Sequence, residues 1–165
     1  MAFRIAEIAS EELILVHQLS YTIWPVCYAN IISEKQIAYM LEKIYSLPAL
    51  KRSMEEGQRF LVAFHESDPV GYSGFEKDQN QPHRCKLQKL YVLPHLHGLG
   101  MGKALFLRTQ SVAIAGGCTS LFLQVNKKNP AVEFYRKLGM SIKEEAIVDI
   151  GNGFVMDDYI MQLDW

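Results

Sequence analysis

The stretch LYVLPHLHGLGMGKALF, residues 90–106, places Gly98, Gly100 and Gly102 at alternate positions. An apolar run that ends in proline precedes these glycines, and a pattern typical of an amphipathic helix follows them. Each glycine costs a helix start roughly 0.5–1 kcal/mol relative to alanine, so three of them need a reason. A turn between a strand and a helix leaves backbone N–H groups free at the positive end of the helix dipole. We therefore interpret residues 97–103 as an anion-binding turn.

Two familiar phosphate-binding motifs do not fit this turn. A P-loop needs four residues between its first glycine and its Gly-Lys pair, with serine or threonine after the lysine. Here three residues separate Gly98 from Gly102, and Ala104 follows Lys103. A dinucleotide fingerprint has the spacing G-x-G-x-x-G early in its domain, whereas these glycines are spaced G-x-G-x-G in mid-chain. Two interpretations of the glycine turn therefore remain: a tight turn with only a structural role, and a phosphate-binding loop of another kind.

The composition is typical of an ordinary globular protein. With 165 residues, 49% hydrophobic residues and a formal net charge of −1, we expect one domain over residues 1–165. This charge balance gives no support for nucleic-acid binding, and no apolar run is long enough for a membrane span. The start of the chain does not resemble a signal peptide. Cys27, Cys85 and Cys118 match neither a disulfide framework nor a metal site, so we expect reduced thiols in a cytoplasmic protein.

Periodicity and turn residues predict a mixed arrangement of strands and helices around the glycine turn. Helical patterns run from Ser10 to Glu56, with Ser33 as an N-cap, from the glycine turn to Gly116, and over residues 129–139. The sequence Gly-Asn-Gly at residues 151–153 predicts a hairpin between the last two strands. The expected strands cover residues 3–9, 58–65, 70–77, 85–94, 119–126, 141–150 and 154–165.

The glycine segment resembles the acetyl-CoA pyrophosphate loop of the GNAT N-acetyltransferase superfamily. Gly100 and Gly102 match the glycines of that loop, Gly98 is a common addition, and His97 stands where the family has glutamine or arginine. Residues 90–94 look like the family's fourth strand. A downstream stretch, NKKNPAVEFYRKLGM, is similar to another family segment through Asn129, Ala131, Phe134, Tyr135 and Gly139, with Met140 in place of phenylalanine.

This resemblance implies an α/β (α+β) fold in a single domain, with a mixed, mostly antiparallel sheet of about seven strands that splays between the fourth and fifth. It implies acetyl-CoA as cosubstrate, no metal, and direct attack of an amine on the thioester. Tyr135 would be the general acid for the departing thiolate, with a tyrosine packed on the sheet as the alternative. A bulge in the fourth strand would free backbone groups for pantetheine, and an N–H near Val92 would stabilise the oxyanion. The implied acetyl-CoA contacts are Leu90, Tyr91, Val92, His97, Gly98, Leu99, Gly100, Met101, Gly102, Lys103 and Asn129.

The acceptor must supply a neutral amine, so we expect a carboxylate or a water chain near it. Lys86 and Gln88 take the polar positions where the family's fourth strand sometimes carries a glutamate base, which favours a route through water. Strand alternation puts two of the acidic candidates, at positions 157 and 158, on opposite faces. The candidate carboxylates are Glu76, Glu133, Asp157 and Asp158.

Aromatic residues between positions 21 and 46 suggest one wall of an acceptor pocket for a cationic amine, with ordinary core packing as the alternative. These residues are Trp24, Tyr28, Tyr39 and Tyr45. We expect a small amine or polyamine as acceptor. The alternative acceptors are a protein N-terminus and a lysine side chain. A non-catalytic acyl-CoA-binding role is the alternative function, and the protein could also form a homodimer.

Overall fold

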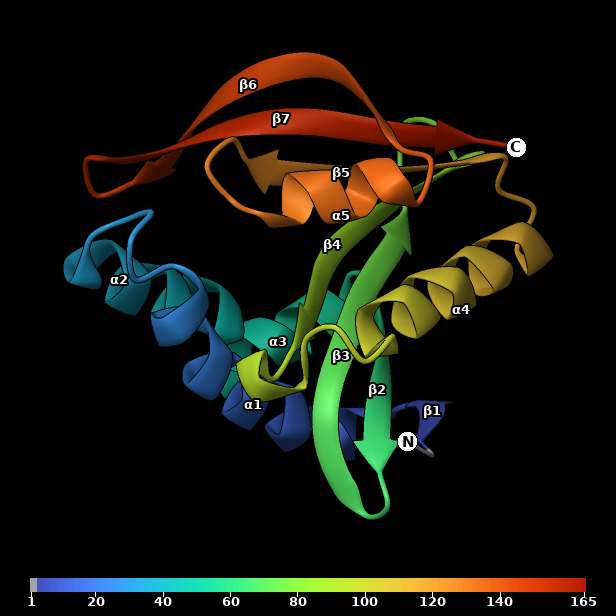
Figure 1. Ribbon diagram of the computed structural model, residues 1–165, viewed down its shortest axis with the longest axis horizontal. Helices are drawn as coiled ribbons and strands as arrows, with labels where there is room; N and C mark the ends of the chain where they lie inside the picture. The colour runs from blue at the N-terminus through green and yellow to red at the C-terminus, as the bar shows by residue number, and fades with distance from the viewer. Residues whose placement is uncertain (1–2) are drawn as a thin grey trace.

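The described part of the chain, residues 3–165 of a computed structural model, forms a seven-stranded sheet in the order β1-β2-β3-β4-β5-β7-β6 (Figure 1). Neighbouring strands are antiparallel except for the parallel pair β4 and β5, which confirms the expected fold class. The strands are β1 (Phe3–Glu7), β2 (Arg59–His65), β3 (Asp68–Lys77), β4 (Arg84–Val92), β5 (Ser120–Asn126), β6 (Ser141–Gly151) and β7 (Phe154–Asp164). The helices are α1 (Leu13–Cys27), α2 (Glu34–Tyr45), α3 (Leu47–Glu55), α4 (Met101–Ala115) and α5 (Ala131–Lys137).

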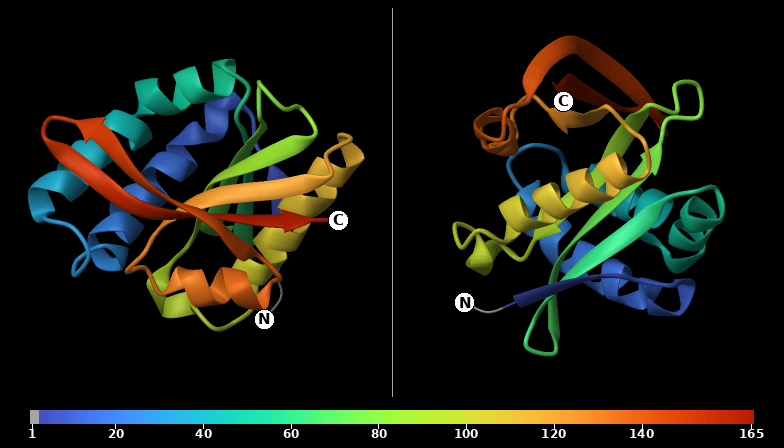
Figure 2. Two further views of the ribbon diagram at one scale, coloured as in Figure 1. Left: turned by 90° about the horizontal axis from the view of Figure 1, so that it is seen from above. Right: turned by 90° about the vertical axis from the view of Figure 1, so that its right-hand side faces the viewer.

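Helices cover both faces of the sheet, and each face has its own hydrophobic core. Helices α4 and α5 pack on one face, and α1, α2 and α3 pack on the other (Figures 1 and 2). A buried hydrogen bond of 2.8 Å joins Ser73 on β3 to Thr109 on α4. On the opposite face, the Ser20 hydroxyl on α1 lies 2.7 Å from the Tyr72 hydroxyl on β3. These contacts fix the helices to the central strands that carry the site.

The helix starts follow the capping residues, with one difference. The Ser33 hydroxyl accepts a hydrogen bond from the backbone of Gln36, as predicted for the start of α2. Ser46 caps α3 in the same way. Ser10, which was expected to begin the first helix, instead starts a single 3₁₀ turn (Ser10–Glu12), and α1 begins at Leu13. Residues 10–56 therefore form three helices.

Two hairpins complete the sheet. The turn between β2 and β3 is shorter than the sequence suggests, because His65 already pairs with Asp68. The Gly-Asn-Gly hairpin between β6 and β7 is confirmed: Gly151 pairs with Phe154, and Asn152 has a φ of 54°.

Strands β4 and β5 diverge soon after they meet. Their pairing covers only Arg84–Lys86 and Ser120–Phe122, and beyond these residues the two strands separate (Figure 1). The expected splay is thus confirmed. The β6–β7 hairpin closes over the far side of this gap by packing on α2, where the Gln36 amide donates to the Val155 carbonyl at 3.0 Å.

Candidate active site

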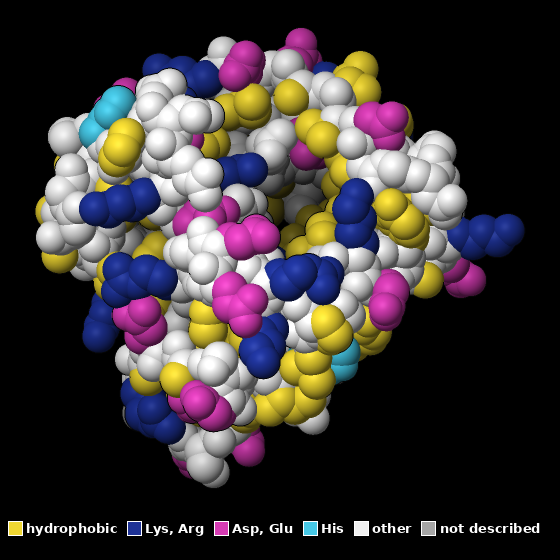
Figure 3. Space-filling model, turned by 180° about the vertical axis from the view of Figure 1, so that it is seen from behind, with side chains coloured by type: hydrophobic (Ala, Val, Ile, Leu, Met, Phe, Trp, Pro, Cys, Tyr) yellow, Lys and Arg dark blue, Asp and Glu magenta, His cyan; other side chains and the backbone are white. Residues whose placement is uncertain are grey.

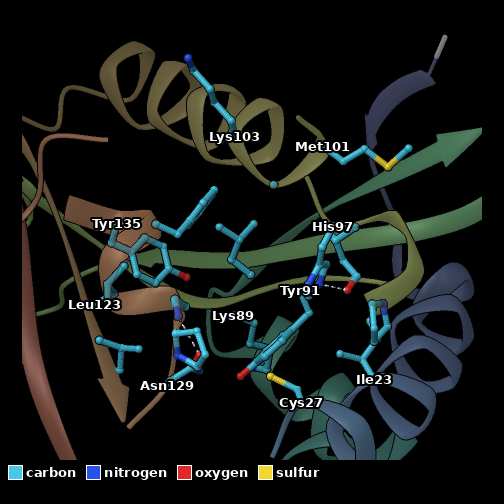
Figure 4. Close-up of a pocket in the computed structure, with 18 of the residues that line it drawn as sticks. Ile23, Cys27, Lys89, Tyr91, His97, Met101, Lys103, Leu123, Asn129 and Tyr135 are labelled. Carbon is cyan, nitrogen blue, oxygen red and sulfur yellow. Dashed lines mark hydrogen bonds between the residues drawn. The ribbon is translucent and has the colours of Figure 1, made fainter. Parts of the chain in front are cut away.

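A cavity of about 630 Å³ occupies the gap between β4 and β5 (Figure 4). Its lining includes consecutive residues of both strands, residues 87–92 and 123–125, so it reaches both faces of the sheet. Figure 3 shows the face that carries α3 hollowed, with hydrophobic side chains inside the hollow and charged side chains around it. The glycine turn, α1 and α5 supply the remaining walls.

Two different structural constraints explain why glycine occupies positions 98, 100 and 102. Gly98 and Gly100 have φ values of 82° and 86°, and a Cβ at either position would meet nothing within 4 Å. Gly102 has an ordinary φ, but its Cβ would lie 3.3 Å from the Phe134 ring, so glycine lets α4 approach α5 closely. Gly100 precedes α4 and no side chain caps that helix. The first N–H groups of α4 therefore face open space, which suits a bound phosphate.

His97 ties the turn to β4. Its Nε2 lies 2.9 Å from the Val92 carbonyl oxygen, so this ring nitrogen must carry the proton that it donates. The N–H of Leu93 donates to Val70 on β3. Because successive residues of a strand direct their polar groups to opposite sides, Leu90 and Val92 direct theirs into the gap. The backbone edge that faces the cavity is therefore available to a ligand, apart from the Val92 carbonyl.

The predicted position of the bulge in β4 is wrong. Residues 90–92 pair without interruption with residues 71–73 of β3. The register instead shifts earlier, because Phe75 pairs with Leu87 while Gly74 pairs with Lys89, which leaves Gln88 as the extra residue. The polar groups of Leu90 and Val92 are free because β5 has moved away from β4.

Tyr135 lies at the cavity wall on α5, and its hydroxyl points into the cavity (Figure 4). The side chain is buried and packs edge-on against Phe134, at 5.3 Å between ring centroids. Burial raises the pKa of this hydroxyl, with a smaller effect from Cys27 on α1 across the cavity. Tyr135 therefore keeps its proton at neutral pH, as a proton donor must.

The other predicted acetyl-CoA contacts differ in how they meet the cavity. The Asn129 side chain lies at the wall and accepts a hydrogen bond from the Ala131 N–H at 2.9 Å, so it caps α5 as predicted. Met101 buries its side chain in the core and presents only its backbone. Lys103 points away from the cavity (Figure 4). Leu99 is exposed and outside the lining.

The predicted aromatic wall is only partly at the cavity. Tyr28 lines it, and its hydroxyl lies 3.0 Å from the hydroxyl of Tyr91 on β4. Trp24 is buried behind Tyr28, with the two rings stacked at 4.2 Å. Tyr45 is buried in the same core, and Tyr39 binds the Ile150 carbonyl of the β6–β7 hairpin. Only Tyr28 of this group is therefore placed to touch a ligand.

The candidate carboxylates have different environments. Glu76 on β3 accepts a hydrogen bond of 2.7 Å from Gln88. Asp157 and Asp158 lie on opposite faces of β7: the first is exposed and pairs with Lys127 at 3.0 Å, and the second is buried. Glu133 is paired with Arg136 on the surface of α5.

Two residues of the cavity wall, Cys27 and Lys89, were not among the site residues predicted from the sequence. Cys27 ends α1 at the wall facing Tyr135, and burial raises the pKa of its thiol. Lys89 is 6% exposed and has its Nζ 2.5 Å from the Gln58 side-chain oxygen. Burial lowers the pKa of Lys89 to about 8. The position of Lys89 in the middle of a predicted central strand is the sequence feature that could have indicated a buried lysine.

Comparisons with known proteins agree with this architecture. A family model described as the acetyltransferase (GNAT) family matches residues 20–140. An uncharacterized N-acetyltransferase of Mycobacterium tuberculosis is 28% identical over 140 residues, which are 84% of this chain and 88% of the relative. The spermidine N(1)-acetyltransferase of Thermoplasma acidophilum is 25% identical over 163 residues, which are 95% and 97% of the two chains.

A solved structure extends the likeness to the whole fold. The PaiA N-acetyltransferase of Thermoplasma acidophilum, crystallised in complex with coenzyme A, has a TM-score of 0.83 and 24% identity, with both chains fully covered. The fold is that of an acyltransferase. The chain belongs to the GNAT acetyltransferase family, whose acetyl donor is acetyl-CoA.

Among residues 3–165, no group of three or more His, Cys, Asp and Glu side chains is arranged to hold a metal ion. No helix in the described part of the chain is long and apolar enough to cross a membrane.

Proposed function

We propose that this protein transfers the acetyl group of acetyl-CoA to a small primary amine, and that Tyr135 protonates the departing thiolate. One observation carries the proposal: the open glycine turn before α4 and the hydroxyl of Tyr135 meet at a single cavity between β4 and β5. A phosphate group at the turn and a thioester near Tyr135 then share one continuous space.

Each wall of the cavity has a distinct task in this reaction. The backbone N–H groups of residues 98–103 hold the pyrophosphate, helped by the dipole of α4. The free edge of β4 at Leu90 and Val92 pairs with the pantetheine arm, and the Val92 N–H stabilises the charge that develops on the thioester oxygen. Tyr135 gives its proton to the sulfur as the bond to the acetyl group breaks.

The acceptor class is supported by one relative and by the cavity. The Thermoplasma acidophilum relative is named for spermidine, a small polyamine. Tyr28 supplies an aromatic surface for an ammonium group at the cavity wall. A panel of monoamines, diamines, polyamines and an N-terminal peptide, with release of free thiol from acetyl-CoA as the readout, tests this assignment. Turnover of the peptide alone would replace the small-amine acceptor with a protein.

Binding of acetyl-CoA is expected to stabilise the fold. A ligand at 100 times its Kd adds about 2.7 kcal/mol to the free energy of unfolding, which corresponds to roughly 5–10 °C in Tm for a chain of this size. Thermal melts with acetyl-CoA, CoA and ATP measure the effect. A shift with ATP and none with acetyl-CoA would show that the glycine turn holds a different nucleotide.

Replacing Gly100 by asparagine is expected to weaken acetyl-CoA binding tenfold or more, about 1.4 kcal/mol, without unfolding the protein. Asparagine tolerates positive φ better than most residues, and its side chain would project into the open space where the pyrophosphate binds. Gly117→Asn is the matched control, because Gly117 has a φ of 88°, equally open surroundings, and lies past the other end of α4. Equal affinity in both variants would leave the turn with a structural role only.

A further inference from the structure

Asp158 on β7 is a buried carboxylate that the fold leaves partly unpaired. The residue is 7% exposed, and its Oδ1 has no hydrogen-bond partner among residues 3–165. Burying a carboxylate is costly unless donors satisfy it. Asp158 is not itself a lining residue of the cavity, but a ligand that extends beyond the lining and brings its own donors would satisfy this unpaired, buried acceptor atom.

The strand register places Asp158 on the acceptor side of the cavity. Asp158 pairs with Asn126 of β5, so Gln124, two residues before Asn126, is its diagonal neighbour on the same face. Gln124 lines the cavity. Such diagonal neighbours lie about 7–8 Å apart, within reach of a bound amine. Met156, two residues before Asp158, touches Gln36 of α2, so this face is opposite to the one that holds Tyr135.

Within residues 3–165, no cation forms an ion pair with Asp158, although Lys86 lies near enough to act on its charge. Asp157 turns to the other face and pairs with Lys127. Lys86 on β4 donates to the side-chain oxygen of Gln124 at 3.1 Å. Ala146 on β6 lies directly opposite Asp158 and Gln36 on α2 is neutral, while Glu144 on β6, opposite Ile160, is a further acidic group on this face. The place opposite the Asp158 carboxylate is thus open to a positive group from outside.

The surroundings of Asp158 bring the pKa of its carboxyl group close to neutral pH. Burial raises the pKa of Asp158 to about 6, Asp157 adds to this effect, and Lys86 opposes it. Asp158 is therefore ionised at pH 7, yet it is a stronger base than an exposed carboxylate. Glu76, the other candidate on this face, already accepts a hydrogen bond from Gln88.

We propose that Asp158 binds the ammonium group of the acceptor and takes its proton, directly or through one water. One N–H bond of the ammonium breaks, its electron pair stays on nitrogen, and an O–H bond forms at the carboxylate. The neutral amine then attacks the thioester carbon, so that a C–N bond forms and the C–S bond breaks. Tyr135 gives its proton to the sulfur, the second proton lost from nitrogen restores the Tyr135 hydroxyl through water, and Asp158 returns the first proton to solvent. This inference rests on the proposed N-acetyltransferase function.

Asp158→Asn is expected to lower kcat/KM for an alkylamine about 100-fold at pH 7, within the usual range for a general base. The acidic limb of the kcat/KM profile, with a midpoint near pH 6 in the wild type, should disappear in this variant. Asp157→Asn is the matched control, because it removes the same charge one residue away on the outer face. It should keep wild-type kcat/KM at pH 7, where Asp158 is already ionised, and should only move the midpoint of the acidic limb to lower pH. Acetyl-CoA affinity should be unchanged in both variants.

An arylamine separates proton removal from other roles of Asp158. Its conjugate acid is far more acidic than an alkylammonium, so it reaches the site as a neutral amine. Asp158→Asn should therefore acetylate an arylamine within a few-fold of the wild-type rate. Asp158→Ala, assayed with added formate, provides a second variant in which an external carboxylate should restore alkylamine turnover.

Two results would overturn this assignment. Full alkylamine turnover by Asp158→Asn would show that another group takes the proton. Equal losses with alkylamine and arylamine, with no rescue by formate, would show that Asp158 only supports the fold or the pocket. Failure of the proposed function looks different: the wild type itself would release no thiol with any amine.

Discussion

Tyr135→Phe is expected to lower kcat about 10–10³-fold and to leave the KM for acetyl-CoA within a few-fold of wild type. The hydroxyl acts on the departing thiolate, so its loss affects the transition state and not ground-state binding. Burial raises the pKa of Tyr135, so this acid keeps its proton throughout the neutral range. An alkaline decline of kcat below about pH 10 should therefore not arise from Tyr135.

Tyr135→Phe keeps the aromatic ring, and with it the packing against Phe106 and Phe134. A thermal melt should show little change. Tyr159→Phe provides a matched control, because Tyr159 lies on β7 outside the cavity lining and should retain wild-type kcat. Undiminished turnover of Tyr135→Phe, with thiol release shown to be rate-limiting, would assign the proton to water or to another group.

Much of the fold follows from local signals that physical chemistry makes strong. The glycine turn before α4, the Ser33 cap and the Gly-Asn-Gly hairpin all act through short-range backbone geometry, and the structure confirms each of them. Ser10 did not indicate where the first α-helix begins, because a 3₁₀ turn and the first turn of an α-helix satisfy similar backbone groups. The β4–β5 splay was expected only through the family resemblance, because it depends on pairing between distant strands.

The wrong position of the bulge explains why Lys89 escaped prediction. Simple alternation along β4 puts Lys89 on the same face as Leu87, among the core residues under α4. The extra residue at Gln88 reverses this alternation, so Lys89 and Tyr91 turn to the face covered by α1, α2 and α3. A register shift of one residue has no reliable signature in a single sequence.

The sequence predicts the parts of the candidate site that depend on backbone geometry or on a motif. It predicts less well which side chains packing directs toward the cavity. Spacing alone does not show that Met101 turns into the core or that Trp24 lies behind Tyr28. Alternation did separate Asp157 from Asp158, but only the three-dimensional structure shows that Asp158 is the buried one and that it pairs with Asn126 of β5. The roles of Tyr135 and of the acetyl-CoA contacts stay predictions until the variants are measured.

Lys89 makes the stability of this protein depend on pH in an unusual direction. Its Nζ is buried against the rings of Tyr45 and Phe60, each 5.6 Å away, and the Gln58 side chain is its one hydrogen-bond partner within residues 3–165. Burial lowers the pKa of Lys89 from 10.5 to about 8, with a small opposing effect of Glu76 and a small supporting effect of Lys86. Between these two pH values, the unfolded chain holds a proton that the folded chain has released.

The contribution of Lys89 to the free energy of unfolding should therefore rise as pH increases from 8 to 10.5, by about 3 kcal/mol. Below pH 8 the fold carries a buried ammonium at nearly full cost. Urea unfolding of the wild type and of Lys89→Met at pH 7.5, 9 and 10.5 isolates this contribution, because the lost Gln58 contact adds only a constant difference. Lys35→Met, at an exposed position on α2, is the control and should parallel the wild type at all three pH values. Parallel curves for Lys89→Met and the wild type would mean that water or a rearranged side chain solvates the Lys89 ammonium in solution.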